Sequence, residues 1–382
     1  MISISIYTTS MDEDKSIFTA EGDKIKFADK SPSLMIDKPI LVFGAPNTGK
    51  TTVVEELIIL TKDYIPNHII IAPITSQDPY TEKFPRMCIK EDMTKKLFVN
   101  IWKRQENITK IYNMANNIEI LGALFKKINN PRAQALVGRA NMLAENHINS
   151  VNNNTGFDFG QKKSQIDAIK DKRKKEIIKI YKSTIRACGS ELNVDELDPD
   201  AVIALKYMDI NPKLMIVVDD CTEKLVKWMK MFKGEDNIFH NVFFRGRHNH
   251  ISMIIISHND RFIPPELRNA ASRIIYTDPQ TFKISLERTT NGFSKEDRKL
   301  GLRCAKKIFA NLPGVKNFQK LCYIKSDFES PFQYTIAEIY PAFSLISGPL
   351  KVLSDHLEAK DREKEKENNS VFVNSLIGKG SN

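Results

Sequence analysis

The sequence has few cysteines and no long apolar run. Its 382 residues include five cysteines, and no two of them form a CxxC pair. A small, odd and dispersed set is typical of reduced thiols in an intracellular protein, which excludes a disulfide framework and a cysteine-based zinc site. No run approaches the ~20 apolar residues of a membrane-spanning helix, so no transmembrane segment is expected. Residues 1–11 lack a basic region and a long apolar core, so they do not form a signal peptide.

The composition is that of a globular protein with an excess of positive charge. Hydrophobic residues make up 41% of the chain, and its length suits one large α/β domain with an insertion, or two domains. The formal net charge is +10 and the pI is about 9.1. An excess of basic residues favours a polyanionic partner, of which nucleic acid is the first candidate, although many basic proteins bind no DNA.

One stretch organises the chain. Residues 44–51 read Gly-Ala-Pro-Asn-Thr-Gly-Lys-Thr, which is a glycine, four residues, then Gly-Lys-Thr. The apolar run 40–43 precedes it and the helix-forming run 52–60 follows, which is the strand–loop–helix context of a P-loop. The glycines let backbone N–H groups turn towards an anion, and the helix N-terminus adds partial positive charge. The pattern predicts that the chain binds a nucleoside triphosphate.

ATP and Mg²⁺ are the predicted cofactors. Lys50 is expected to reach the β- and γ-phosphates, and the Thr51 hydroxyl to ligate Mg²⁺. The predicted nucleotide-binding residues are nine in succession: Gly44, Ala45, Pro46, Asn47, Thr48, Gly49, Lys50, Thr51 and Thr52.

A pair of acids follows a second apolar run. Residues 214–218 are all apolar, and Asp219 and Asp220 come directly after them. This pattern predicts a buried strand that delivers two carboxylates beside the P-loop. Asp219 would hold Mg²⁺, and Asp220 would orient and deprotonate the attacking water. The alternative is a buried strand that ends in a turn with two solvated aspartates, but the P-loop favours the catalytic interpretation.

The next strand offers a polar residue at its end and two arginines before it. Residues 251–256 form the predicted strand, and His258 follows as the candidate sensor of the γ-phosphate. A structural histidine is the alternative. Seven residues at ~3.3 Å each separate the strand's ends by about 20 Å, so Arg245 and Arg247 do not easily reach their own subunit's phosphates. Arg247 is the candidate arginine finger for a neighbouring subunit, and a surface or DNA-contacting arginine is the alternative.

The remaining pattern predicts further strands and a long helical region. Strands are expected at 68–73, 273–277, 320–324 and 332–339, and helices at 221–232, 264–271 and 294–310. The loop 75–79 is expected near the nucleotide, because it follows a strand of the parallel sheet. Ser294 is a predicted helix cap, with Asp297 completing a weak capping box.

Residues 91–207 are mostly helical in pattern. A short strand at 97–102 and a polar loop at 149–160 are the expected exceptions. Residues 161–186 carry ten Lys/Arg against three Asp/Glu with a partial apolar stripe. This segment is interpreted as an amphipathic helix with a solvated basic face, or as a contact for DNA or another subunit.

These patterns together predict an α/β fold: a RecA-like P-loop NTPase core with a mainly parallel sheet and a helical insertion. An N-terminal arm is expected at 1–38, with a short β-like piece at 2–7. The ATPase domain is expected at 39–345, with the insertion at about 103–210. A charged C-terminal tail is expected at 346–382.

Four motifs resemble those of a known family. They are residues 44–51, the strand ending Val218-Asp219-Asp220, Gly246-Arg247-His248 leading into Ile251-Ser252, and Arg268-Asn269 after Pro264-Pro265. The chain resembles, from about Pro39 to Pro341, the genome-packaging ATPases of nucleocytoplasmic large DNA viruses of the poxvirus, iridovirus and mimivirus type. These belong to the FtsK–HerA group of P-loop motors. The P-loop alone is not specific to the family, whereas the Asp-Asp pair together with the Gly-Arg-His strand is more so.

The resemblance implies a ring-forming ATPase that pumps double-stranded DNA into a preformed capsid. Its implied partners are DNA, further copies of the chain in a homo-oligomeric ring, and capsid or membrane-associated virion proteins. The implied location is the viral factory in the host cytoplasm, or the virion. Lys50 and Thr51 would bind phosphates and Mg²⁺, Asp219 would bind Mg²⁺, and Asp220 would be the catalytic acid. The sequence departs from the family at His258, where the family usually has Gln, and at Asp220, where the wider group often has Glu.

Three other functions remain compatible with the sequence. A cellular-type DNA translocase or helicase would unwind strands or carry a membrane anchor. A nucleotide-dependent switch in capsid assembly would hydrolyse ATP slowly, without stimulation by DNA. A small-molecule P-loop kinase would transfer phosphate to an acceptor and ignore DNA.

Overall fold

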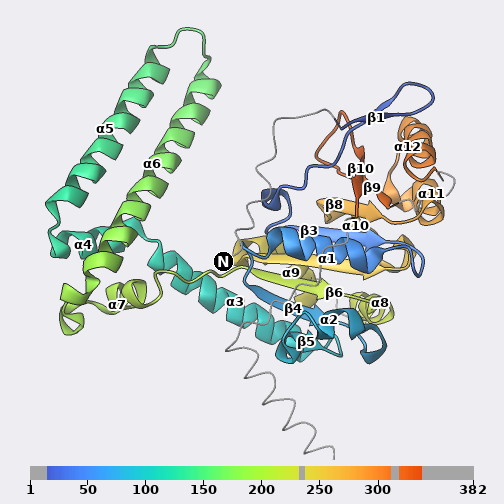
Figure 1. The fold of residues 1–382 in the computed structure, drawn as a ribbon, viewed down its shortest axis with the longest axis horizontal. Coiled ribbons are helices and arrows are strands. Elements are labelled where there is room, and N and C mark those ends of the chain that lie inside the picture. Colours follow the sequence, from blue (N-terminus) through green and yellow to red (C-terminus); the bar gives the residue numbers. More distant parts are fainter. Residues whose placement is uncertain (1–14, 232–236, 311–317, 338–382) are drawn as a thin grey trace, which may run out of the picture. The chain divides into compact units, whose positions relative to one another are not determined.

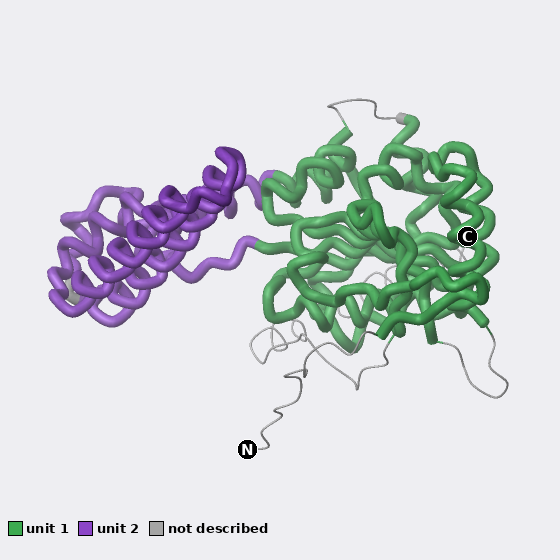
Figure 2. The backbone as a smooth tube through the Cα atoms, turned by 90° about the horizontal axis from the view of Figure 1, so that it is seen from above, with its two compact units in different colours: residues 1–102, 213–382 green, residues 103–212 purple. Residues whose placement is uncertain are grey.

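The structure is a computed structural model that describes residues 15–231, 237–310 and 318–337. The expected β-like piece at 2–7 and the expected C-terminal tail at 346–382 lie outside these residues. The chain divides into two compact units, which Figure 2 colours separately. Unit 1 comprises residues 1–102 and 213–382, and unit 2 comprises residues 103–212.

Unit 1 is built on an eight-stranded sheet (Figure 1). Its strand order is β10-β9-β8-β3-β7-β6-β4-β5. The six strands from β8 to β5 in this order are parallel, whereas β9 runs antiparallel to both of its neighbours. The bounds are β3 Pro39–Phe43, β4 Asn67–Ile71, β5 Ile89–Lys90, β6 Leu214–Val218, β7 Ile251–Ser257, β8 Arg273–Tyr276, β9 Gln319–Tyr323 and β10 Phe332–Ile336.

The strand order confirms the predicted fold class. The P-loop strand β3 lies between β8 and β7, and the acid-bearing strand β6 is separated from β3 by β7. This is the order of a RecA-like P-loop core, to which β5 adds a short parallel strand and β9–β10 an antiparallel extension. All the parallel strands end at the same edge of the sheet, which is where open α/β sheets bind ligands.

Both faces of the sheet are buried, as a parallel sheet requires. Every residue of β6 and of β7 is buried. Side chains alternate between the faces along a strand, so Leu41 and Phe43 pack with α8, α9, α11 and α12, while Ile40 and Val42 pack with α1. The helices of unit 1 are α1 Lys50–Thr61, α2 Asp78–Thr81, α8 Thr222–Met231, α9 Ile238–Arg245, α10 Pro265–Ala270, α11 Pro279–Glu287 and α12 Lys295–Ile308.

Most of the predicted elements are present with small shifts in their bounds. The predicted cap of α12 is confirmed, because Asp297 N donates to Ser294 Oγ and Ser294 N to an Asp297 carboxylate oxygen. The sequence patterns did not predict α9, α11, or the small hairpin of β1 Ile17–Phe18 and β2 Lys24–Ile25.

The predicted strand at 97–102 is wrong. These residues lie in the first turns of a long helix, α3 Lys95–Ala115. Their apolar side chains recur at helical rather than alternating spacing, and Phe98 and Ile101 are buried in the core. The polar loop expected at 149–160 is shorter than predicted, because α5 ends at Asn153 and α6 begins at Phe159.

Unit 2 is helical. Its elements after α3 are α4 Ile118–Ile128, α5 Pro131–Asn153, α6 Phe159–Cys188 and α7 Pro199–Lys206, and α5 and α6 lie side by side in Figure 1. The predicted basic helix is confirmed as α6, which begins with a capping box of Asp158 and Gln161. At the ends of the unit, the buried Gln105 donates from Nε2 to the Pro212 carbonyl oxygen over 2.9 Å. Among the described residues, no helix has the length and apolarity needed to cross a membrane.

Candidate active site

The loop between β3 and α1 has the backbone geometry of an anion cradle. Gly49 precedes α1 with φ of 87°, and Asn47 also has a positive φ of 61°. Gly44 has no room for a side chain, because a Cβ there would lie 1.8 Å from Thr277 Oγ1. The chain can therefore turn sharply here and present successive N–H groups at the start of a 12-residue helix.

Lys50 lies across the mouth of this loop. Its Nζ donates to the carbonyl oxygens of Gly44 and Ala45, each over 2.8 Å, and lies 3.5 Å from Nδ1 of His258. Burial lowers the pKa of Lys50, and the carboxylates of Asp219, Asp278 and Asp220 oppose this shift. The ammonium group thus lies between the phosphate-binding loop and the acids.

The two acids after β6 have different surroundings. Asp219 is partly buried, and its Oδ2 accepts a hydrogen bond from Tyr80 Oη over 2.8 Å. Burial raises the pKa of Asp219, while the Tyr80 hydrogen bond opposes the rise. Asp220 is exposed, has a left-handed φ of 52°, and accepts a hydrogen bond from Ser76 Oγ over 3.1 Å. Asp220 also lines the cleft described below.

His258 lies between the lysine and the second acid. Its Nε2 is 3.5 Å from Asp220 Oδ1, and its Nδ1 is the atom that approaches Lys50. This position follows from the strand order, because β7 pairs with both the P-loop strand and the acid-bearing strand. The residue predicted as a sensor is therefore placed beside the predicted base and the predicted phosphate-binding lysine.

These side chains line one cleft of about 530 Å³. Its walls also include residues of the loop after β4, which was expected to lie near the nucleotide. The lining residues are Pro46, Asn47, Lys50, Thr51, Thr75, Ser76, Asp78, Pro79, Asp219, Asp220, Ile256, Ser257 and His258. Thr51 and Asp219 offer the hard oxygen donors that Mg²⁺ prefers, so the residues present fit that ion.

Arg247 lies apart from this cleft. It belongs to the short helical turn 246–249 before β7, at the opposite end of that strand from His258. Its side chain is exposed, with Nε 3.4 Å from His248 Nε2. Arg247 therefore does not line the cleft of its own chain. Five of the nine predicted nucleotide-binding residues belong to the loop and helix start but do not line the cleft: Gly44, Ala45, Thr48, Gly49 and Thr52.

Four residues that support the site were not singled out from the sequence. Tyr80 and Ser76 donate to the two acids, as described above. Thr277 Oγ1 forms a hydrogen bond with Thr48 Oγ1, and Asp278 Oδ2 accepts from Ala45 N over 2.9 Å, so the end of β8 braces the P-loop. Asp278 could have been found from the sequence, because an Asp-Pro pair after a predicted strand marks a helix start, and its Oδ1 indeed caps α11 through Thr281 N.

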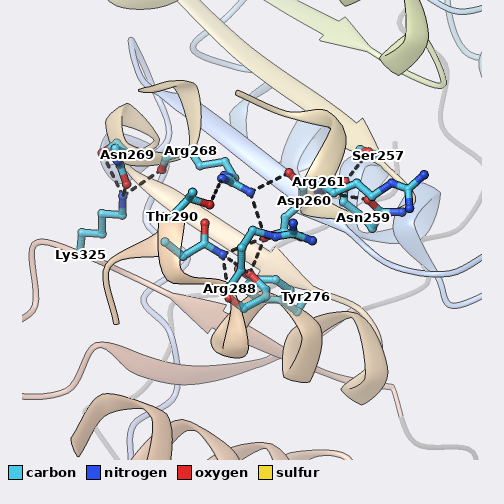
Figure 3. Close-up of polar contacts among 12 residues, drawn as sticks. Ser257, Asn259, Asp260, Arg261, Arg268, Asn269, Tyr276, Arg288, Thr290 and Lys325 are labelled. Carbon is cyan, nitrogen blue, oxygen red and sulfur yellow. Dashed lines mark hydrogen bonds and ion pairs between the residues drawn. The ribbon is translucent and has the colours of Figure 1, made fainter. Parts of the chain in front are cut away.

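A buried polar network fixes the loop that follows His258 (Figure 3). Asp260 is completely buried, and its carboxylate accepts hydrogen bonds from Arg268, Arg288, Asn291 and Ser285. Burial lowers the pKa of Arg268, which the Asp260 carboxylate opposes. Arg268 belongs to one of the family-like motifs, and here it donates to Asp260 and Thr290 instead of lining the cleft.

The fold and the site define the class: a RecA-like P-loop NTPase fold with an acid pair and a polar residue at the neighbouring strand ends. No family model matches the chain. It is similar to the uncharacterized protein B354L of African swine fever virus, with 26% identity over 353 residues that cover 87% of this chain and 91% of the relative.

Two solved structures are also similar to the chain at low identity. The genome-packaging NTPase B204 of Sulfolobus turreted icosahedral virus 2, in complex with ATPγS, is 10% identical, covers 79% of this chain and 98% of its own, and has a TM-score of 0.34. The plasmid coupling protein TrwB, in complex with ADP and Mg²⁺, is 10% identical, covers 89% and 92%, and has a TM-score of 0.32. The fold assignment itself rests on the strand order and the P-loop.

Proposed function

We propose that this protein is an ATP-hydrolysing motor that moves double-stranded DNA, in the packaging of a viral genome. The observation that carries the hydrolytic part is the convergence of Lys50, Asp219, Asp220 and His258 on one cleft behind a P-loop. A structural strand end with two solvated acids would not need a tyrosine and a histidine directed at those acids.

Each residue has a distinct role in the proposed reaction. The loop N–H groups and Lys50 bind the phosphates, while Thr51 and Asp219 would hold Mg²⁺, which supplies charge neutralisation when bound. Asp220 is exposed to the cleft and orients and deprotonates the attacking water. His258 lies next to both Lys50 and Asp220, so it can respond when the terminal phosphate leaves.

The DNA and assembly parts of the proposal rest on other features. The net charge of +10 favours a polyanion, and the exposed Arg247 is free of its own subunit's cleft, as a finger acting on a neighbouring copy in a ring would be. The relative B354L is a viral protein, so we place this chain in an infected cell or virion. Capsid or membrane-associated virion proteins complete the proposed partners.

The test is steady-state ATP hydrolysis with and without long double-stranded DNA, at two salt concentrations, for the wild type and Asp220→Asn. We expect stimulation by duplex DNA that is lost at high salt, because grip through phosphates releases counterions. The variant should be inactive with or without DNA. Hydrolysis that ignores DNA would reject the motor and favour a nucleotide-dependent switch in capsid assembly. Phosphate transfer to a small acceptor would instead indicate a kinase.

A further inference from the structure

Lys320 lies beside the P-loop on a strand outside the parallel core. It is the second residue of β9, where Leu321 pairs with Tyr276 of β8 and Lys320 pairs with Thr335 of β10. Lys320 is therefore level with Thr277, the residue that contacts the P-loop through Thr48. Cys322, on the same face of β9, packs in the cluster that contains the α1 side chains. The Lys320 side chain consequently extends over the α1 face of the sheet.

The Lys320 ammonium group is directed at the N-terminus of α1. A Cβ placed on Gly49, the residue just before this helix, would lie 3.5 Å from Cε and 3.6 Å from Nζ of Lys320. Residues 49–51 are where the P-loop turns into the helix and where its free N–H groups gather. A second cation, besides Lys50, thus stands at the anion-binding end of α1.

This cation is buried and has no hydrogen-bonding partner among the described residues. Lys320 is only 6% exposed, and none of the hydrogen bonds or ion pairs formed within those residues involves its Nζ. The negative charge of Asp278 acts on the Lys320 ammonium group. The two oxygens of that carboxylate, however, already accept hydrogen bonds from Ala45 N and Thr281 N. Burial lowers the pKa of Lys320, and Asp278 opposes the shift. A desolvated ammonium group held in this way is prepared for an anionic ligand.

We propose that Lys320 binds the α-phosphate side of the nucleotide. The residues expected at the terminal phosphate, Asp220 and His258, follow β6 and β7, on one side of the P-loop strand. Lys320 lies on the other side, beyond β8. A nucleotide whose terminal phosphate faces the acids therefore presents its α-phosphate towards Lys320. This inference rests on the proposed nucleotide binding, and it makes Lys320 a contact for ADP as much as for ATP.

The experiment measures the affinities of the full chain for ADP and for ATP by calorimetry, in the presence of Mg²⁺. Lys320→Met should weaken the binding of both nucleotides by a similar factor, about tenfold to a hundredfold, because a charge-assisted hydrogen bond is lost. Lys320→Arg should retain most of the affinity. Lys325→Met is the matched control: this lysine lies in the loop after the same strand, is also partly buried, and donates to the carbonyl oxygens of Arg268 and Asn269 away from the cleft.

The possible outcomes separate this inference from the proposed function. If the wild type binds, Lys50→Ala loses binding and Lys320→Met binds normally, Lys320 is structural and only this inference is overturned. A loss for ATP alone would place Lys320 at the terminal phosphate and would also overturn it. If the wild type binds neither nucleotide, the proposed function itself fails. Should Lys320→Met unfold, which circular dichroism would show, Lys320→Gln gives the same comparison with a polar side chain.

Discussion

Two acidic groups follow neighbouring strands of the sheet, and their surroundings are opposite. Asp219 and Asp220 follow β6, open into the cleft, and accept one side-chain hydrogen bond each from Tyr80 and Ser76. Asp260 follows β7, is completely buried, and accepts from four side chains. Asp219 and Asp220 therefore retain oxygen lone pairs that can bind a ligand. The Asp260 carboxylate instead uses its hydrogen-bonding positions on groups of the protein itself.

This difference distinguishes an acid that can bind a ligand or accept a proton from an acid that stabilises the fold. A buried carboxylate must be paired and hydrogen-bonded, because an uncompensated charge in the interior is costly. An acid with free oxygen positions in a cleft, next to a lysine, can bind a cation or accept a proton. The same residue type at adjacent strand ends therefore has two roles, and each of the following experiments tests that division.

The largest expected effect is on catalysis at the open pair. Asp220→Asn should lower the rate of ATP hydrolysis by about 10²- to 10⁴-fold, because the proposed general base is lost. Nucleotide affinity should stay close to that of the wild type, and so should the urea midpoint, because Asp220 is exposed. Steady-state hydrolysis, calorimetric ATP binding and urea unfolding measure the three quantities. A variant that still hydrolyses ATP at a wild-type rate would show that Asp220 is only a solvated turn residue.

The second effect is on stability at the buried acid. Asp260→Ala should lower the free energy of unfolding by about 3–5 kcal/mol, because it leaves the Arg268 guanidinium buried without its counter-ion. Urea unfolding followed by circular dichroism measures the loss. Asp171→Ala is the control, since Asp171 forms an exposed pair with Lys175 and should contribute little. Equal midpoints for the two variants would contradict a structural role for the network.

A smaller effect concerns the pH dependence of the open pair. Tyr80 donates to the ionised form of Asp219, so Tyr80→Phe should raise the pKa of Asp219 above its already raised value. More of the carboxylate is then protonated at a given acidic pH, and the acid limb of hydrolysis should move to higher pH. Profiles of kcat/KM between about pH 5 and pH 8 would measure the shift. Tyr207→Phe, at an exposed tyrosine of unit 2, should leave the profile unchanged, and an unmoved limb in Tyr80→Phe would argue against Asp219 as an essential ionised group.

The smallest effect is expected at the sensor position. His258→Gln keeps a side chain able to contact both Lys50 and Asp220, so hydrolysis should change by less than about tenfold. His258→Ala removes both contacts and should be slower than the glutamine variant. The ratio of the two rates is the measurement. Equal rates would show that no polar group is needed at this strand end.

The sequence was most informative where the chemistry is local. The P-loop, the strand before it and the run ending in Asp219-Asp220 are contiguous, so short patterns predicted both the elements and the residues of the site. Tyr80 could not be predicted as the partner of Asp219, because 139 residues separate them. The Asp260 network was also missed, because its members belong to separate short helices and loops, although they lie only 8 to 31 residues from Asp260. The start of α3 was predicted as a strand, because residues 97–102 are so densely apolar that their helical spacing is hidden.

The contact between Gln105 and Pro212 has a consequence for the history of this chain. It joins the two ends of the helical unit, so that the 110 residues from Lys103 to Pro212 begin and end at one place. A module closed in this way can be gained, lost or exchanged in a single genetic event without stretching the strands that it interrupts. Related chains could therefore keep the same catalytic edge while they carry different modules, or none, at this one junction.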